Sequence, residues 1–175
     1  MRLKTNGLSL IAYFCLQNIF LFMLQAGDKA PDFKAIDQYG QEHQLKDYKG
    51  KKLAIYFYPK DNTPTCTTQA CNLRDHFNTL SDKGITILGV SIDATKSHQK
   101  FSDKFQLNFP ILADEDHHMV DAYQVWQLKK FMGREYMGTV RTTFLINEKG
   151  IIEHIIDKVK SKEHAQQILD TWQLN

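Results

Sequence analysis

The stretch that decides the fold is residues 52–91, KLAIYFYPKDNTPTCTTQACNLRDHFNTLSDKGITILGVS. It opens with the apolar run Lys52–Tyr58 and closes with Ile85–Ser91, both rich in branched and aromatic residues, which is typical of strands buried on both faces. Between them, apolar side chains recur at helical spacing at Ala70, Leu73, Phe77 and Leu80. The spacing predicts one amphipathic helix over about 64–81. Strand, helix and strand form a βαβ unit, so we expect the two strands to be central and parallel.

Shorter patterns follow this unit. Thr95–Phe105 predicts a second helix, and Ile111–Ala113 predicts a short strand. Thr142–Ile146 and Ile151–Ile156 are separated only by the polar turn Asn147–Gly150. Because so short a connection cannot make a parallel crossover, the two runs predict a hairpin, and the sheet should be mixed.

The chain should close with a helix after Ser161, which we assign as its N-cap. The apolar positions of this helix are Ala165, Ile168, Leu169 and Trp172. A βαβ unit followed by a hairpin and a final helix resembles the thioredoxin fold, an α/β fold with a central mixed β-sheet flanked by helices. No repeat, low-complexity stretch or linker interrupts the sequence after Gln25, so we expect one thioredoxin-like domain over 26–175. Fold alone does not fix chemistry.

Composition limits the function classes. The chain has 175 residues, of which 42% are hydrophobic, and such a length buries roughly two-thirds of its unfolded surface as one domain. Lys and Arg number 22 against 20 Asp and Glu, and the two extra positives, Arg2 and Lys4, precede Met23. The sequence contains no basic run, which argues against a nucleic-acid binder. The segment Asp114–His118 favours a solvated loop before a helix over a metal site.

Residues 1–25 form an apolar N-terminal extension. Leu8–Leu24 is largely apolar after a basic start, but it is too short and too interrupted by polar residues for a membrane span, so no stable membrane association is expected. Two interpretations stay open: a secretory signal peptide that ends near Gln25, and an over-extended gene start with translation from Met23. The first predicts export to the periplasm and the second a cytoplasmic protein. Cys15, inside this run, is interpreted as a small apolar residue.

The chemically informative segment is 58–71, YPKDNTPTCTTQAC, where a central strand leads into a helix. Ligands of open α/β sheets gather outside the carboxyl ends of the strands. Pro64 suits the first helical position, which places Cys66 in the first turn. Unpaired N–H groups and the positive end of the helix dipole favour a thiolate there. Cys66 also extends the apolar stripe, so we expect its sulfur in a pocket facing the sheet; the alternative is an inert core cysteine.

Cys71 lies five residues after Cys66 and off the apolar stripe. In an intact helix, residues five apart have Cα atoms about 8.7 Å apart, beyond the limit of about 7 Å for a disulfide. Our hypothesis is that Cys66 is oxidised to a sulfenic acid, that the Cys71 thiolate attacks it, and that the helix unwinds locally as the disulfide forms. An external dithiol would then restore both thiols by exchange.

At this segment the sequence resembles a known family. Pro59-x-x-x-Thr63-x-x-Cys66 is similar to the active-site motif of peroxiredoxins, and YPKDNTPTCTTQACNLRD resembles their bacterioferritin comigratory protein, or peroxiredoxin Q, subgroup. The segment Gly138–Phe144 is similar to the family's second signature, and the match runs from about Met23 to the C-terminus.

The resemblance implies a thioredoxin-dependent peroxidase that reduces hydrogen peroxide and organic hydroperoxides in antioxidant defence, without a cofactor or a metal. It implies that Cys66 is the peroxidatic cysteine and Cys71 the resolving one, joined in a redox-active disulfide. It further implies that Thr63 binds the peroxide, Pro59 shields the site and Arg141 is the cation beside the thiolate. Thioredoxin or a similar dithiol would be the reductant, and the protein would be a monomer.

The resemblance adds to what the residues alone predict. Without it, Arg141 would be interpreted as a surface charge before a strand. The family usually has Gly where this chain has Thr65, a difference that we expect to leave activity intact because that position mainly supplies backbone.

Two rival functions remain on the residues alone. A general thiol-disulfide oxidoreductase would want two cysteines about two residues apart at the helix start. A metal-binding module would use Cys66, Cys71 and His76, which span three helical turns and lack a convincing fourth ligand.

Overall fold

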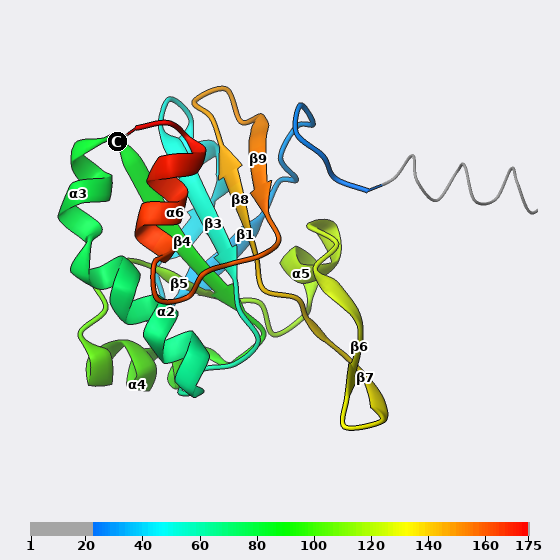
Figure 1. Ribbon diagram of the computed structural model, residues 1–175. Helices are drawn as coiled ribbons and strands as arrows, with labels where there is room; N and C mark the ends of the chain where they lie inside the picture. The colour runs from blue at the N-terminus through cyan, green and yellow to red at the C-terminus, as the bar shows by residue number, and fades with distance from the viewer. Residues whose placement is uncertain (1–22, 175) are drawn as a thin grey trace, which may run out of the picture.

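The two apolar runs form neighbouring strands at the centre of the fold. β3 (Lys52–Phe57) and β4 (Ile85–Ser91) pair in parallel, with Lys52 opposite Ile85. The predicted βαβ unit is therefore confirmed. In the computed structural model, which describes residues 23–174, they belong to a seven-stranded sheet of order β2-β1-β5-β4-β3-β8-β9 (Figure 1). The N-terminal run up to Phe22, including Cys15, lies outside the described residues. The structure therefore tests neither interpretation of that run.

The other predicted strands complete a mixed sheet. β5 (Ile111–Ala113) follows α4 (Thr95–Phe105) and pairs in parallel with β4. β8 (Thr142–Ile146) is antiparallel to β3, and β9 (Ile152–Ile156) is antiparallel to β8. These observations confirm the predicted second helix, short strand and hairpin.

The predicted single helix over 64–81 is wrong, because two helices replace it. α2 (Pro64–Asp75) and α3 (Phe77–Asp82) are separated by His76. Nδ1 of His76 lies 2.8 Å from the carbonyl oxygen of Asn72, to which the backbone N–H of His76 also donates at 3.2 Å. The side chain thus competes with the helical bond at the break. The apolar stripe runs on across the break, which is why the sequence pattern does not reveal it.

The assignment of Ser161 as an N-cap is also wrong. α6 (His164–Thr171) begins after Glu163, which makes no side-chain capping bond. Asn72 of α2 supplies the cap instead: its Oδ1 accepts from the N–H of Ala165 at 2.8 Å, and its Nδ2 donates to the carbonyl oxygen of Lys162 at 2.9 Å. A helix end needs a partner for its free N–H groups, and here a tertiary contact provides it. The same contact fastens α6 to α2.

The helix expected after the Asp114–His118 loop is α5 (His118–Ala122). The remaining elements had no clear sequence pattern. They are β1 (Lys34–Asp37), β2 (Glu42–Gln44), the 3-10 helix η1 (Leu45–Tyr48), β6 (Trp126–Phe131) and β7 (Arg134–Thr139). β1 joins β5 and β2 at the edge of the sheet. β6 and β7 form a separate two-stranded sheet that projects from the body of the molecule (Figure 1).

The sheet separates two hydrophobic cores, because successive side chains of a strand point to opposite faces. On β3, Ala54 and Tyr56 belong to one core, which α2, α3, α4 and α6 close. The intervening side chains, Leu53, Ile55 and Phe57, belong to the other core, together with residues of η1 and α5. Cys66 lies in the first core, on the side of α6.

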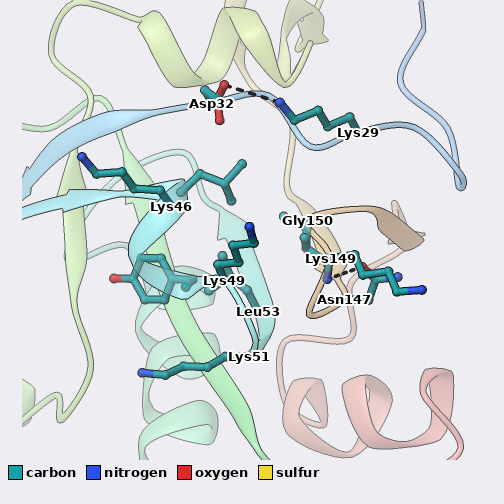
Figure 2. Close-up of a pocket in the computed structure, with 12 residues that line it drawn as sticks. Lys29, Asp32, Lys46, Lys49, Lys51, Leu53, Asn147, Lys149 and Gly150 are labelled. Carbon is teal, nitrogen blue, oxygen red and sulfur yellow. Dashed lines mark hydrogen bonds and ion pairs between the residues drawn. The ribbon is translucent and has the colours of Figure 1, made fainter.

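Two further features complete the fold. Within residues 23–174, no helix has the length and apolar character needed to cross a membrane. At the amino end of β3, a pocket of about 200 Å³ opens among five lysines (Figure 2). We call it the lysine pocket. It is lined by Lys29, Asp32, Leu45, Lys46, Tyr48, Lys49, Lys51, Leu53, Ile146, Asn147, Lys149 and Gly150.

Candidate active site

The connection from β3 to α2 places Cys66 at the carboxyl end of the central strands. Thr63 occupies the N-cap of α2 with an extended backbone, and Pro64 opens the helix as predicted. Cys66 follows in the first turn with only 2% of its surface exposed. The predicted burial of this sulfur against the sheet is confirmed. In the first turn of a helix, N–H groups without helical acceptors and the helix dipole favour an anion.

Arg141 is brought to the same place by the register of β8. Because β8 runs antiparallel to β3 with Thr142 opposite Phe57, the residue before β8 lies at the carboxyl end of β3. Nη2 of Arg141 donates to Sγ of Cys66 at 3.0 Å, across 75 positions of sequence. Arg141 is half-buried, so its interpretation as a plain surface charge is wrong. A guanidinium that stays charged stabilises a thiolate at this distance.

Three residues that the sequence analysis missed form the chain of contacts that holds Arg141 in place. Nη1 of Arg141 donates to Oε1 of Gln69, one turn after Cys66 on α2. Nε2 of Gln69 lies 3.0 Å from Nδ1 of His164 on α6, and Nε2 of His164 lies 2.9 Å from Oγ1 of Thr143 on β8. Gln69, His164 and Thr143 are fully buried. We call Arg141, Gln69, His164 and Thr143 the arginine relay.

The arginine relay has one consistent direction of donation. Because Oε1 of Gln69 accepts from Arg141, the amide nitrogen of Gln69 must donate to Nδ1 of His164, whose Nε2–H then donates to Thr143. This arrangement requires a neutral imidazole. Burial, and secondly the charge of Arg141, lower the pKa of His164 to about 3. His164 is therefore neutral at physiological pH, as the relay needs.

The other predicted site residues lie along the same connection. Thr63 is half-buried, and its Oγ1 donates to the carbonyl oxygen of Lys60 at 3.1 Å. Pro59 is half-buried, and Thr65 is exposed in the first turn of α2. The side chain of Thr65 is therefore in solvent, whereas Cys66 next to it is buried.

Comparison with known proteins identifies the family. Residues 26–155 match the AhpC/TSA family. This chain belongs to that family. It is 44% identical to peroxiredoxin Bcp of Bacillus subtilis over 148 residues, which are 85% of this chain and 94% of that protein. It is also 44% identical to peroxiredoxin Bcp of Escherichia coli over 147 residues, 84% of this chain and 94% of that protein.

Solved structures agree with these relatives. The bacterioferritin comigratory protein of Xanthomonas campestris, a structure described as giving insights into its alkyl peroxide reduction, superposes with a TM-score of 0.79 at 33% identity. The superposition covers 85% of this chain and 98% of that one. This chain is thus a peroxiredoxin of the bacterioferritin comigratory protein, or peroxiredoxin Q, group, a thiol-dependent peroxidase on a thioredoxin-type fold.

The second cysteine of this peroxiredoxin lies further along α2. Cys71 is half-buried, and Cys66 and Cys71 are both free thiols. Both belong to the continuous helix Pro64–Asp75. Helical geometry keeps residues five apart beyond disulfide reach, so the structure corresponds to the reduced peroxiredoxin.

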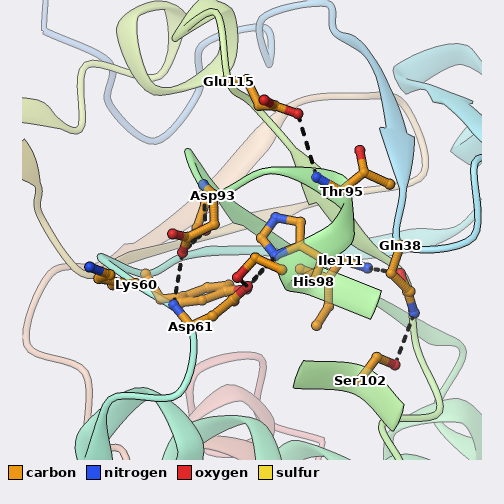
Figure 3. Close-up of polar contacts among 12 residues, drawn as sticks. Gln38, Lys60, Asp61, Asp93, Thr95, His98, Ser102, Ile111 and Glu115 are labelled. Carbon is orange, nitrogen blue, oxygen red and sulfur yellow. Dashed lines mark hydrogen bonds and ion pairs between the residues drawn. The ribbon is translucent and has the colours of Figure 1, made fainter. Parts of the chain in front are cut away.

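A buried carboxylate braces the loop that carries Thr63 (Figure 3). The carboxylate of Asp61 accepts hydrogen bonds from the hydroxyls of Tyr58 and Ser97, both at 2.7 Å, and from Nδ1 of His98 at 2.9 Å. The backbone N–H of Asp61 donates to Oδ2 of Asp93 at 2.8 Å. Burial alone would raise the pKa of Asp61, but the hydrogen bonds and the charge of His98 hold it below its ordinary value. The loop is thereby fastened to β3 and α4.

Cys66, His76 and Asp114, which were considered for a metal, have other partners. Cys66 faces Arg141, and the ring of His76 bonds to a backbone carbonyl. Asp114 accepts from the N–H groups of Met119 and Val120 at 2.9 and 2.8 Å, so it caps α5. The loop before a helix is confirmed, although Asp114 is buried instead of solvated. In the range 23–174, His, Cys, Asp and Glu side chains form no group of three that would hold a metal ion.

Proposed function

We propose that this peroxiredoxin reduces hydrogen peroxide and organic hydroperoxides through Cys66 and recovers through a Cys66–Cys71 disulfide. The contact between Arg141 and the Cys66 sulfur, at 3.0 Å, is the observation that carries the proposal. A buried thiol next to a permanent cation, at the start of a helix, is set up to react as a thiolate. The description of the X. campestris relative as acting on alkyl peroxides supports organic hydroperoxides as substrates.

In the first step, the Cys66 thiolate attacks the terminal oxygen of the hydroperoxide. An S–O bond forms and the O–O bond breaks, so Cys66 is oxidised to a sulfenic acid and the peroxide is reduced to an alcohol or to water. The departing oxygen develops negative charge and then takes a proton. Arg141 stabilises both the thiolate and this oxygen. Thr63 binds the peroxide through its hydroxyl, and Pro59 shields the sulfur from water.

In the second step, the Cys71 thiolate attacks the sulfur of the Cys66 sulfenic acid. The S–S bond forms and the S–O bond breaks, and the departing hydroxide takes a proton to leave as water. Because both cysteines lie in α2, the first turns of this helix must unwind before the sulfurs meet. A dithiol, for which we propose thioredoxin, then reduces the disulfide by thiol exchange and is itself oxidised.

The cellular setting belongs to the same proposal. We propose a monomer that works in the cytoplasm, where dithiol reductants keep such a disulfide cycling. Residues 26–175 would form the catalytic domain. If residues 1–25 were a signal peptide, the peroxiredoxin would work outside the cytoplasm; cell fractionation together with N-terminal sequencing decides between these outcomes.

The direct test compares Cys66→Ser with Cys71→Ser in a peroxide-consumption assay driven by a thioredoxin system. Cys66→Ser should show no consumption above background. Cys71→Ser should consume about one equivalent of peroxide and then stop. Thr67→Ser, on the same turn, is the matched control and should keep full turnover. Sustained thioredoxin-driven turnover by Cys71→Ser would contradict the role of Cys71, and turnover by Cys66→Ser would contradict the whole proposal.

A further inference from the structure

The lysine pocket lies at the end of the sheet opposite Cys66. It opens beside Lys51 and Leu53 at the amino end of β3, whereas Cys66 follows the carboxyl end of that strand. A strand of six residues spans about 20 Å. The pocket is therefore too far from Cys66 to take part in the reactions proposed there.

Positive charge dominates the rim of the pocket. Five lysines line it, together with one carboxylate residue (Figure 2). The rim lysines are Lys29, Lys46, Lys49, Lys51 and Lys149. All five are exposed, and only Lys29 has a carboxylate partner among the lining residues, Asp32 at 3.8 Å. Since Lys plus Arg balance Asp plus Glu from Met23 onward, this is a local excess of charge in a neutral domain.

The floor of the pocket is apolar. Leu53 and Ile146 are about 1% exposed, and Leu45 and Tyr48 are below 10%. The hydroxyl of Tyr48 lies 2.6 Å from Nδ1 of His43, in hydrogen-bond contact with it. Tyr48 therefore contributes its apolar ring, and not its hydroxyl, to the floor of the pocket. An apolar floor under a cationic rim suits a ligand with an apolar body and an anionic head, better than it suits a bare ion.

Backbone hydrogen bonds fix the walls of the pocket relative to one another. The N–H of Gly50 donates to the carbonyl oxygen of Glu148 at 2.9 Å, and that of Ala30 donates to the carbonyl oxygen of Gly150 at 2.9 Å. The segment after η1, the N-terminal segment and the β8–β9 turn therefore hold their lysines around one opening. A site that is already formed loses less entropy when it binds.

We infer that the lysine pocket binds a small organic anion with an apolar body, of the size of a short-chain carboxylate. The anionic head would lie among the ammonium groups and the hydrocarbon part against Tyr48, Leu53 and Ile146. This inference does not rest on the proposed peroxidase cycle.

The test uses hexanoate as the probe and backbone amide NMR of the full reduced chain as the readout. Hexanoate should shift the amides of Gly50, Lys149 and Gly150. Acetate carries the head without the body, and 1-hexanol the body without the charge; each should bind at least about fivefold more weakly. Equal binding of acetate, or of inorganic phosphate, would overturn the apolar part of the inference, and equal binding of 1-hexanol the anionic part.

Variants locate the site. Lys46→Gln/Lys49→Gln should weaken hexanoate binding by about tenfold, since two exposed charge contacts are lost. The matched control, Lys83→Gln/Lys100→Gln, removes two exposed lysines elsewhere and should bind as the parent does. Both should keep the parent melting temperature and peroxide turnover. Shifts that avoid the pocket amides, or a pocket variant that binds like the control, would overturn the inference, whatever the outcome of the peroxidase tests.

Discussion

At the scale of single residues, the reactivity of Cys66 depends on side chains that are distant in sequence. Arg141 contacts the sulfur, Gln69 orients Arg141, and His164 orients Gln69. These contacts fix one another's direction, because a Gln69 amide whose oxygen accepts from Arg141 turns its nitrogen toward Nδ1 of a neutral His164. We therefore regard Gln69 and His164 as positioning residues for Arg141.

This view predicts the effect of Gln69→Ala. Loss of the amide frees Arg141 and leaves Nδ1 of His164 without its donor, so the reaction of Cys66 with hydrogen peroxide should slow about tenfold. Stopped-flow measurement of the peroxide reaction checks this. Gln69→Glu still accepts from Arg141 but cannot donate to Nδ1 of His164, so it should recover only part of the rate, and Gln99→Ala on the exposed face of α4 should have no effect. A full rate in Gln69→Ala would show that Arg141 needs no anchor.

A second residue-scale prediction concerns pH. The pKa of Asp61 lies below its ordinary value of 3.8 in the folded protein, so its contribution to stability is present above that value and is lost as pH falls through the folded pKa. Asp61→Asn should therefore lower the free energy of unfolding by about 1–3 kcal/mol at pH 7, and the deficit should shrink below about pH 4. Urea unfolding from pH 7 to pH 3 measures both. The exposed Asp82→Asn should behave like the parent, and a deficit for Asp61→Asn that stays constant with pH would contradict the assignment.

The site was predictable where chemistry follows from local sequence. The position of Cys66 after Pro64 and on the apolar stripe indicated a buried thiol at a helix start, which the structure confirms. Arg141 required the family resemblance, because only the register of β8 against β3 brings it to the sulfur. Gln69 could have been predicted as a site residue, because it is a polar residue on the buried face of α2, one turn after Cys66. His164 could not have been, since its partners come from α2 and β8.

At the scale of elements, α2 has to be stable when reduced and easy to unwind when oxidised. Three threonines lie in its first turns, at positions 65, 67 and 68. Threonine is a poor helix former because its branched side chain loses rotamer freedom. Oγ1 of Thr68 also bonds back to the carbonyl oxygen of Pro64 at 2.9 Å, a contact that slightly weakens a helix. The composition of these turns therefore favours local unwinding.

Thr68→Ala tests this idea. Alanine should stabilise the helix by about 0.5 kcal/mol, so formation of the Cys66–Cys71 disulfide should slow about twofold while the first reaction with peroxide keeps its rate. Rapid mixing that follows decay of the sulfenic acid gives the rate of the second step. The matched control is Thr79→Ala, an exposed threonine of α3 outside the unwinding segment, and it should change neither rate. An unchanged second step in Thr68→Ala would mean that helix stability does not limit resolution.

The elements that were predicted are those with both faces buried or with strong helical spacing. β3, β4 and α4 bury regular apolar patterns, whereas the β6–β7 arm exposes its apolar residues Leu128, Tyr136 and Met137, so its apolar positions do not mark a buried face. The sequence of the turn between β6 and β7 did not predict a hairpin either. Met132 and Gly133 both have positive φ, 49° and 79°, as a two-residue hairpin turn requires, but Asn or Asp is the usual first residue of such a turn. The break between α2 and α3 at His76 was not predicted, because the apolar stripe continues across it.

At the scale of the whole molecule, the N-terminal segment of the domain is tied to strand β9. The N–H of Gly27 donates to the carbonyl oxygen of Ile152 at 2.8 Å, and the N–H of Ile152 donates to the carbonyl oxygen of Asp28 at 2.9 Å. Ala30 and Phe33 then enter the second core beside η1 and α5. Within the described residues, these ties begin a few positions after Met23, close to the boundary proposed for the domain.

The last prediction follows from these ties. A chain that starts at Met23 keeps every contact from Gly27 onward, so it should fold to the same structure, melt within about 2 °C of the full chain and consume peroxide at the same rate. A shift of that size corresponds to about 0.5–1 kcal/mol for a domain of this length. A start at Lys34 is the matched comparison: it removes the ties of Gly27 and Asp28 and the core residues Ala30 and Phe33, and it should melt far lower or fail to fold. If the Met23 chain melted as low as the Lys34 chain, residues 1–22 would have to belong to the folded domain.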